Sequence, residues 1–240
     1  MIGAFLNALG ILLGGLYGLA IRKPLSAATQ GFFKSGLVAF TVFFGLRLVW
    51  ENLHSPVLTS LKQLCIAVLA LILGRLLGKG LRLQRMSNHL GRHAATLIAT
   101  AQKPNAPNRS GGLTAATILF CAAPLGILGA VADGLGNYYY LLAVKAVMEG
   151  LAMASFAKIF RWPVILSAGP VFLFLTGLTG AVHAQALPWL EAHHLVEAVN
   201  LTIGMMVCTL SLVILEIRRV ELANYLPALA LAPALAHWLM

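Results

Sequence analysis

Three ionisable side chains stand in an otherwise apolar stretch of this 240-residue sequence, GAVADGLGNYYYLLAVKAVMEG (129–150). They are Asp133, Lys145 and Glu149. Placing an ionised side chain inside a membrane costs roughly 2.5–3.5 kcal/mol on insertion scales, so such residues usually mark a pathway for ions or substrates. Lys145 and Glu149 are four positions apart, which puts them on one face of a helix, where they can pair.

We expect Asp133 to lie within reach of the long Lys145 side chain, so that the three charges sum to −1. A proton or a small cation would neutralise this residual charge, which predicts a binding or coupling site. The alternative is a structural ion pair that holds two helices together, with the additional acid kept protonated by burial. The sequence leaves both interpretations open.

Prolines and glycines interrupt the apolar segments on either side of these charges. Pro124 and Gly126 precede them, and Gly169 and Pro170 follow them. Interrupted helices expose backbone carbonyls and helix N-termini, which can bind ions or anionic groups where they line a cavity. For either segment alone, an ordinary proline kink is the simpler interpretation. Further candidates for polar lining are Asn7, Asn137 and Asn200.

Histidine and glutamate gather in a second place, just before residue 200. His193 and Glu197 have the i, i+4 spacing of a helical pair, and such ligands suit zinc or a similar divalent ion. A fixed tetrahedral ligand spacing is absent, so these two residues are weak candidates and we expect no metal site. We also find no phosphate-binding loop, zincin motif or nucleophile elbow, and therefore expect neither an enzyme nor a cofactor.

The composition places these residues in a membrane protein. The chain is 60% hydrophobic and 10% charged, with a mean hydropathy of +0.87, whereas globular proteins carry about 25% charged residues. At about 20 apolar residues per span, the length predicts an all-α polytopic helix bundle of about eight spans. The net charge of +10 fits basic cytoplasmic loops, and no clustered basic surface indicates nucleic acid.

The apolar segments predict a topology with the N-terminus outside. Arg22 and Lys23 follow the first segment instead of preceding it, which favours an uncleaved first helix. With eight spans, both termini lie outside and most of the 17 basic residues lie inside, as the positive-inside rule requires. The segments fall at about 2–21, 32–50, 57–77, 113–133, 138–160, 164–182, 196–215 and 223–240, the last interrupted by proline.

We interpret the chain as one membrane domain in two halves. Residues 1–101 hold three spans and a basic amphipathic helix over 80–97 at the cytoplasmic surface, 102–112 form a flexible linker, and 113–240 hold the other spans. Segments one to three and six to eight would have opposite orientations, so the order admits a 3+2+3 inverted repeat. Gly10, Gly14 and Gly18 form a smooth helix face for close packing, with lining of a permeation path as the less favoured alternative.

Four stretches carry a resemblance to a known family. FCAAPLGILGAVADGL (120–135), KAVMEGLAMASFA (145–157), NYLPALALAP (224–233) and the opening GAFLNALGILLGGLYGL (3–19) are similar to the YqgA/YdfK-type family of bacterial integral membrane proteins, a domain-of-unknown-function family. The resemblance covers nearly the whole chain and implies a protein of the bacterial inner membrane. The family pattern more often has Asp where this chain has Glu149, which keeps the charge and lengthens its reach.

These observations predict a secondary transporter or channel-like permease for a small solute or ion, coupled to protons or cations through Asp133, Lys145 and Glu149. The rival hypothesis is a non-transporting scaffold or sensor in which the same charges are structural. The expected partners are membrane lipids and the solute or ion, with no nucleic acid. The glycine face of the first helix also suggests a homo-oligomer.

Overall fold

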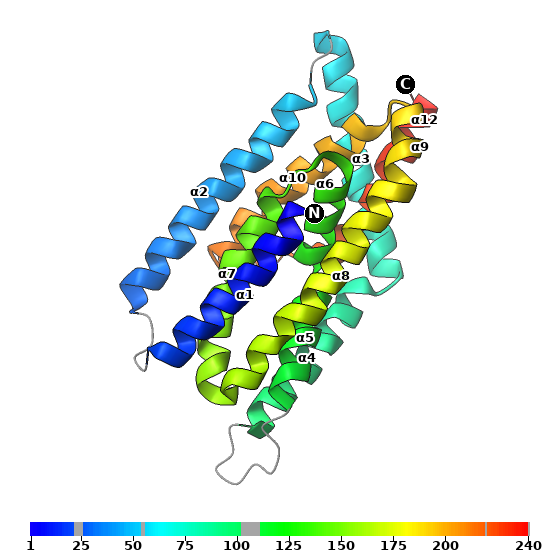
Figure 1. The fold of residues 1–240 in the computed structure, drawn as a ribbon. Coiled ribbons are helices and arrows are strands. Elements are labelled where there is room, and N and C mark those ends of the chain that lie inside the picture. Colours follow the sequence, from blue (N-terminus) through cyan, green and yellow to red (C-terminus); the bar gives the residue numbers. More distant parts are fainter. Residues whose placement is uncertain (22–25, 54–55, 102–110, 219, 240) are drawn as a thin grey trace. The chain divides into compact units, whose positions relative to one another are not determined.

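Long apolar helices form the protein, and the part of the chain described by the computed structural model is all-helical (Figure 1). The described residues are 1–21, 26–53, 56–101, 111–218 and 220–239. Their contacts divide the chain into two units. Unit 1 comprises Met1–Ser26 and Arg85–Gly180, and unit 2 comprises Ala27–Gln84 and Ala181–Met240. Each unit thus combines segments that are distant in the sequence.

Six helices of the described residues are long and apolar enough to cross a membrane, and a bent pair makes up to seven. The six are Ile2–Ala20, Ala28–Glu51, Val57–Gly80, Tyr140–Phe160, Trp162–Ala192 and Val196–Ile214. The multi-pass architecture is therefore confirmed, and these helices match six of the segments predicted from hydropathy. The predicted final span does not pass as one helix, because α11 (Leu222–Tyr225) and α12 (Ala228–Leu239) are separated at Leu226 and Pro227.

Unit 1 is built around the pairing of α1 (Ile2–Ala20) with α7 (Tyr140–Phe160) (Figure 1). A Cβ atom added at Gly10 would lie 2.5 Å from the Ala146 carbonyl oxygen, and one at Gly14 would lie 2.1 Å from that of Gly150. At Gly18 the same atom would lie 2.3 Å from the Ala154 oxygen. The glycine face therefore serves close helix packing within the chain, which confirms the favoured interpretation.

The helix break predicted at Pro124 is present in unit 1. α5 (Gly111–Ala122) and α6 (Pro124–Gly136) meet at a bend of 57°. Pro124 occupies the first turn of α6, where its missing N–H would have had no intrahelical partner. α5 already begins at Gly111, so the last two residues of the predicted linker are helical, and 102–110 lie outside the described residues.

The interruption predicted at Gly169 and Pro170 is wrong. The helical run Trp162–Ala192 continues through this point and only changes type, from the 3-10 helix η1 (Trp162–Ser167) to α8 (Ala168–Ala181). Pro170 lies in the first turn of α8, where proline is compatible with a helix. Further along, the π-helix η2 (Val182–Ala186) leads into α9 (Leu187–Ala192).

Unit 2 contains α2 (Ala27–Glu51), α3 (Val57–Gly80) and α10 (Val196–Ile214), together with α11 and α12. α2 packs on α10, where a Cβ at Gly45 would lie 2.9 Å from Cys208 Sγ. α3 packs on the C-terminal helices. A Cβ at Gly78 would lie 2.1 Å from the Asn224 carbonyl oxygen, and one at Gly74 would lie 2.6 Å from the Ala228 nitrogen. Small residues again permit the close approach.

The predicted amphipathic helix after the third span is present as α4 (Leu83–Ala101). Its large side chains Met86 and Leu90 are exposed, as are Arg85 and Arg92. Arg82 joins α3 to α4 with φ 57, a left-handed conformation that lets the chain change direction between two helices. Of the basic residues on which the topology rests, Arg22, Lys23, Lys103, Arg109 and Arg219 lie outside the described residues.

Candidate functional site

The centre of the site is an ion pair inside unit 1. Lys145 and Glu149 lie one turn apart on α7, and their residues are 1% and 6% exposed. The Lys145 ammonium group donates a hydrogen bond to Glu149 Oε1. The i, i+4 pairing predicted from the sequence is therefore confirmed, and both partners are buried.

Asn7 completes the surroundings of the carboxylate. It lies on α1, is fully buried, and donates from Nδ2 to Glu149 Oε2 over 2.9 Å. Each carboxylate oxygen thus accepts one hydrogen bond from a neighbouring side chain. Asn7 reaches Glu149 because α1 and α7 approach each other so closely at Gly10 and Ala146. Among the weak candidates for polar lining, Asn7 is the one that the structure brings to the charged residues.

Asp133 is buried but does not pair with Lys145 as expected. Its residue is 2% exposed, and its Oδ2 accepts a hydrogen bond from the Gly3 backbone N–H over 3.2 Å. The backbone nitrogen of Met1 lies 3.1 Å from the same oxygen. Asp133, on α6, therefore contacts the start of α1 and does not contact Lys145.

Two acceptor atoms of this cluster have no hydrogen-bond partner among the described residues. They are Asn7 Oδ1 and Asp133 Oδ1, and both are buried. Gly3, which binds Asp133, and Asn7 are one turn apart on α1, or about 6 Å along the helix axis. A buried acceptor without a donor is unfavourable. The cluster is thus rich in acceptors, which is the environment that a proton or a cation prefers.

The helix break lies beside the lysine. A Cβ atom added at Gly126, in the first turns of α6, would lie 2.9 Å from Lys145 Cε. A side chain at this position would therefore have to shift the end of Lys145, and the bend at Pro124 brings the first turns of α6 next to that residue. Gly126 thus lies beside Lys145, and Pro124 begins the helix that carries Gly126.

The other predicted lining residues lie elsewhere. Asn137 is exposed and ends α6 in the left-handed conformation, with φ 55, a structural role that asparagine tolerates well. Gly169 and Pro170 are exposed on α8. Asn200 belongs to unit 2, where its Nδ2 donates to Asn52 Oδ1 over 3.2 Å.

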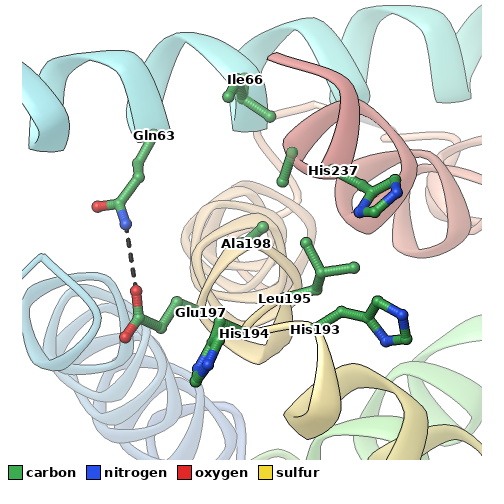
Figure 2. A pocket seen from close by; sticks show the side chains of 9 residues that line it. Gln63, Ile66, His193, His194, Leu195, Glu197, Ala198 and His237 are labelled. Carbon is green, nitrogen blue, oxygen red and sulfur yellow. Dashed lines mark hydrogen bonds between the residues drawn. The ribbon is translucent and has the colours of Figure 1, made fainter. Parts of the chain in front are cut away.

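The weak metal candidates His193 and Glu197 line one pocket of unit 2 (Figure 2). No group of three or more His, Cys, Asp or Glu residues in the described part of the chain is arranged to hold a metal ion. Glu197 instead accepts a hydrogen bond from Gln63 Nε2 over 3.2 Å. The i, i+4 spacing assumed that one helix carries both residues, and this was wrong: His193 lies in the turn after α9, and Glu197 lies in the first turn of α10.

Sequence reasoning missed several polar residues that the structure uses. Gln63 on α3 is 6% exposed and Asn224 on α11 is 3% exposed. Asn224 Oδ1 accepts from the Gln84 backbone N–H over 3.1 Å, which ties α11 to the start of α4. A lone amide within an apolar span was the available signal for Gln63. The Gly74-xxx-Gly78 spacing was the signal for the packing of α3.

The comparisons with known proteins agree with this architecture. Residues 2–237 match the family described as "Protein of unknown function (DUF554)". Two similar relatives are "Uncharacterized membrane protein YdfK" of Bacillus subtilis (strain 168), 24% identical with 97% of this chain and 94% of the relative covered, and "Uncharacterized protein YqgA" of Escherichia coli (strain K12), 28% identical with 99% and 97% covered. No solved structure matches the chain. Since the match covers almost the entire sequence, this multi-pass membrane protein belongs to the DUF554 family, as the resemblance indicated.

Proposed function

We propose that this protein is a secondary transporter or channel-like permease for a small solute or ion, with Glu149 as its proton- or cation-binding carboxylate. The observation that carries the proposal is the buried group of Lys145, Glu149 and Asn7, together with two buried acceptors, Asn7 Oδ1 and Asp133 Oδ1, that have no hydrogen-bond partner among the described residues. A protein that only needed stability would gain little from buried charges, because apolar residues of similar volume are often as stabilising.

The chemistry follows from which atoms can take a positive charge. Protonation of Glu149 would end its ion pair and leave the Lys145 ammonium group without its partner. A small cation beside Asn7 Oδ1 or beside Asp133 Oδ1 would instead give a partner to a buried acceptor. Either event changes the forces between α1, α6 and α7. The bend beside Gly126 is the place where α6 can respond by moving.

The detailed topology is part of the proposal. We propose eight crossings with both termini outside the bacterial inner membrane, the eighth formed by α11 and α12. These helices run along α3 from Gly78, which meets Asn224, to the end where Ile66 and Ala236 line one pocket. They thus follow a candidate span from residue 78 to residue 66, which is about half of its 24 residues. The single membrane domain and the inverted repeat also stay predictions.

The proposal includes membrane lipids as partners, with α4 at the cytoplasmic surface, and contains no enzymatic step, cofactor or nucleic acid. The prediction of a homo-oligomer no longer has the observation on which it rested. The glycine face of α1, from which we inferred oligomerisation, packs against α7 of the same chain.

A scaffold or sensor is the second candidate. The observation that favours it is that Lys145 and Glu149 already satisfy each other, so that the pair could simply stabilise α7 beside α1. Exchanging the two charges, Lys145→Glu with Glu149→Lys, separates the candidates. A scaffold should tolerate the exchange, whereas a coupling site should not, because the carboxylate would leave Asn7.

The test is a flux assay on the full chain reconstituted in vesicles, with ions, organic acids and amino acids offered under a proton or sodium gradient. We expect flux of at least one solute by the wild-type protein and loss of that flux in the charge-exchanged variant at equal incorporation. Absence of flux for every solute, from protein with a normal unfolding transition, would favour the scaffold.

A further inference from the structure

Three basic residues gather at the C-terminal end of α3, in unit 2. They are Arg75, Lys79 and Arg82, and all three are exposed. The Leu81 N–H donates to the Leu77 carbonyl oxygen over 2.8 Å, so helical hydrogen bonding extends just past the end of α3. The i, i+4, i+7 spacing of the three residues therefore brings them to one side of the helix end. We call this group the basic cluster.

Asn224 of α11 fixes the turn that carries Arg82. Its carbonyl oxygen lies so close to α3 that a Cβ atom at Gly78 would be 2.1 Å away. Its Oδ1 accepts a hydrogen bond from the Gln84 backbone N–H over 3.1 Å. The Gln84 side chain in turn accepts from the Ala223 backbone N–H over 3.2 Å. The turn is thus held on both sides of Arg82, whose φ of 57 reverses the direction of the chain.

The charges of the basic cluster are not neutralised by acids of the described chain. No member of the cluster takes part in the ion pairs of the described residues. Glu221, the residue before α11, accepts a hydrogen bond from Asn224 Nδ2 over 2.9 Å. The guanidinium carbon of Arg75 lies over the Tyr225 ring, 5.8 Å from its centroid. A guanidinium group above a ring keeps the N–H donors at its edge for a second partner.

An exposed apolar strip adjoins the basic cluster along α3. It consists of Val68, Ile72 and Leu76, which are 41%, 54% and 60% exposed. These residues are four positions apart and therefore lie on one side of the helix. The last of them, Leu76, directly follows Arg75 in the sequence. The surface of α3 thus changes along its axis from exposed apolar side chains to exposed positive charges.

The length of α3 places these two features at different depths of a membrane. Its 24 residues span about 36 Å at 1.5 Å per residue, and the hydrocarbon core of a bilayer is about 30 Å thick. Lys79 and Arg82 then lie at the level of the lipid headgroups, and the long Arg75 side chain can extend to that level. The apolar strip lies within the core.

We propose that this end of α3 is a binding site for an anionic phospholipid. The basic cluster donates hydrogen bonds to the lipid phosphate, and an acyl chain lies along the apolar strip. Arginine suits this ligand, because its planar group can donate two parallel hydrogen bonds to two phosphate oxygens. A lipid with net negative charge fits better than a zwitterionic one, whose own ammonium group opposes the three positive charges. Free phosphate fits less well, because it has no chain for the apolar strip.

This inference goes beyond the proposed transport function and does not rest on it. All residues of the lipid site belong to unit 2, and the proposed coupling residues belong to unit 1. Lipid binding can therefore be measured on the purified protein without any flux, and Glu149→Gln should leave it unchanged. Loss of lipid binding in Glu149→Gln would overturn the assignment of the site to unit 2.

The test is native mass spectrometry of the detergent-solubilised full chain, titrated with phosphatidylglycerol or with phosphatidylcholine of the same acyl chains. We expect saturable binding of phosphatidylglycerol and binding of phosphatidylcholine that is at least about fivefold weaker. Lys79→Gln and Arg82→Gln should each weaken phosphatidylglycerol binding about fivefold, the usual contribution of one basic side chain at an anionic lipid surface. Both residues are exposed, so thermal unfolding of the variants should match that of the wild type.

The matched control is Lys62→Gln. Lys62 is an exposed basic residue near the other end of α3, so the variant loses the same charge from the same helix and should bind phosphatidylglycerol like the wild type. No saturable binding, equal affinity for the two lipids, or unchanged affinity in Arg82→Gln would each overturn the proposal. An equal loss in Lys62→Gln would also overturn it, by showing diffuse attraction. Displacement of the lipid by inorganic phosphate would assign the basic cluster to a free anion instead.

Discussion

Glu149 is an acceptor on both of its oxygens, and the two donors come from different helices. Lys145 binds it from its own helix α7, and Asn7 binds it from α1. The pair was predictable because i, i+4 spacing places two residues on one helix face. Asn7 as partner was not, since the sequence pattern does not say which helices become neighbours. The same limit explains why Asp133 was assigned to Lys145 although it binds Gly3.

Removing only the lysine should destabilise unit 1. We expect Lys145→Met to lower the free energy of unfolding by about 3–5 kcal/mol, because it leaves a buried carboxylate without its charged partner. The double variant Lys145→Met, Glu149→Met should regain most of the loss. Thermal unfolding in detergent measures both effects. A single variant as stable as the wild type would show that the buried ion pair does not matter for the fold.

A matched control exists on α2. Arg47 and Glu51 form an ion pair with the same i, i+4 spacing, but their side chains are 47% and 44% exposed. Exposed pairs contribute about 0–1 kcal/mol. Arg47→Met should therefore shift the unfolding transition far less than Lys145→Met does.

Gly126 should be sensitive to a single methyl group. Gly126→Ala would put a Cβ atom 2.9 Å from Lys145 Cε, so the end of the buried lysine side chain must shift. We expect the free energy of unfolding to fall by about 1–3 kcal/mol, as for other cases of overpacking, and thermal unfolding measures it. Gly136→Ala in the same helix is the control, because nothing lies within 4 Å of its Cβ position. Equal effects of the two variants would contradict the assigned contact.

At the scale of elements, hydropathy located the spans and proline chemistry located one of two breaks. The chain does bend at Pro124, where α6 begins. At Pro170 it does not, because the helical run Trp162–Ala192 continues through this residue. Both prolines lie in the first turn of an α-helix, so proline chemistry alone does not separate the bent site from the continuous one.

The contact between α1 and α7 rests on glycine. Gly14→Ala would place a Cβ atom 2.1 Å from the Gly150 oxygen, a backbone atom that cannot rotate away. The two helices must therefore separate, which also moves Asn7 away from Glu149. We expect the free energy of unfolding to fall by at least about 1–3 kcal/mol, measured by thermal unfolding. Gly36→Ala on α2, with nothing within 4 Å, should be neutral or slightly stabilising. A neutral Gly14→Ala would contradict the close approach.

At the scale of the whole molecule, the class of protein followed from composition, whereas the division into units did not. The sequence suggested halves separated at about residue 102. The contacts instead join Met1–Ser26 to Arg85–Gly180 and Ala27–Gln84 to the C-terminal part. Helices that pair although they are more than 100 residues apart in the sequence, such as α1 and α7, cannot be recognised as partners from local hydropathy. A single sequence therefore cannot reveal it.

The proposed orientation can be tested on intact cells. In a variant without its three cysteines, a new cysteine at Glu191 should react with a membrane-impermeant maleimide, and one at Gly80 should not. Both residues are exposed, and the topology places the first outside and the second inside. Lysed cells, in which both should react, are the control. Labelling of position 80 but not of position 191 on intact cells would reverse the orientation.

The most direct test of the central claim compares two glutamates in the reconstituted flux assay. Glu149→Gln keeps the shape of the side chain and removes its charge, and Glu51→Gln does the same at the exposed pair on α2. With equal amounts of folded protein per vesicle, we expect gradient-driven flux to be abolished in Glu149→Gln and retained in Glu51→Gln. Full flux and unchanged pH dependence in Glu149→Gln would contradict the assignment of Glu149 as the coupling carboxylate.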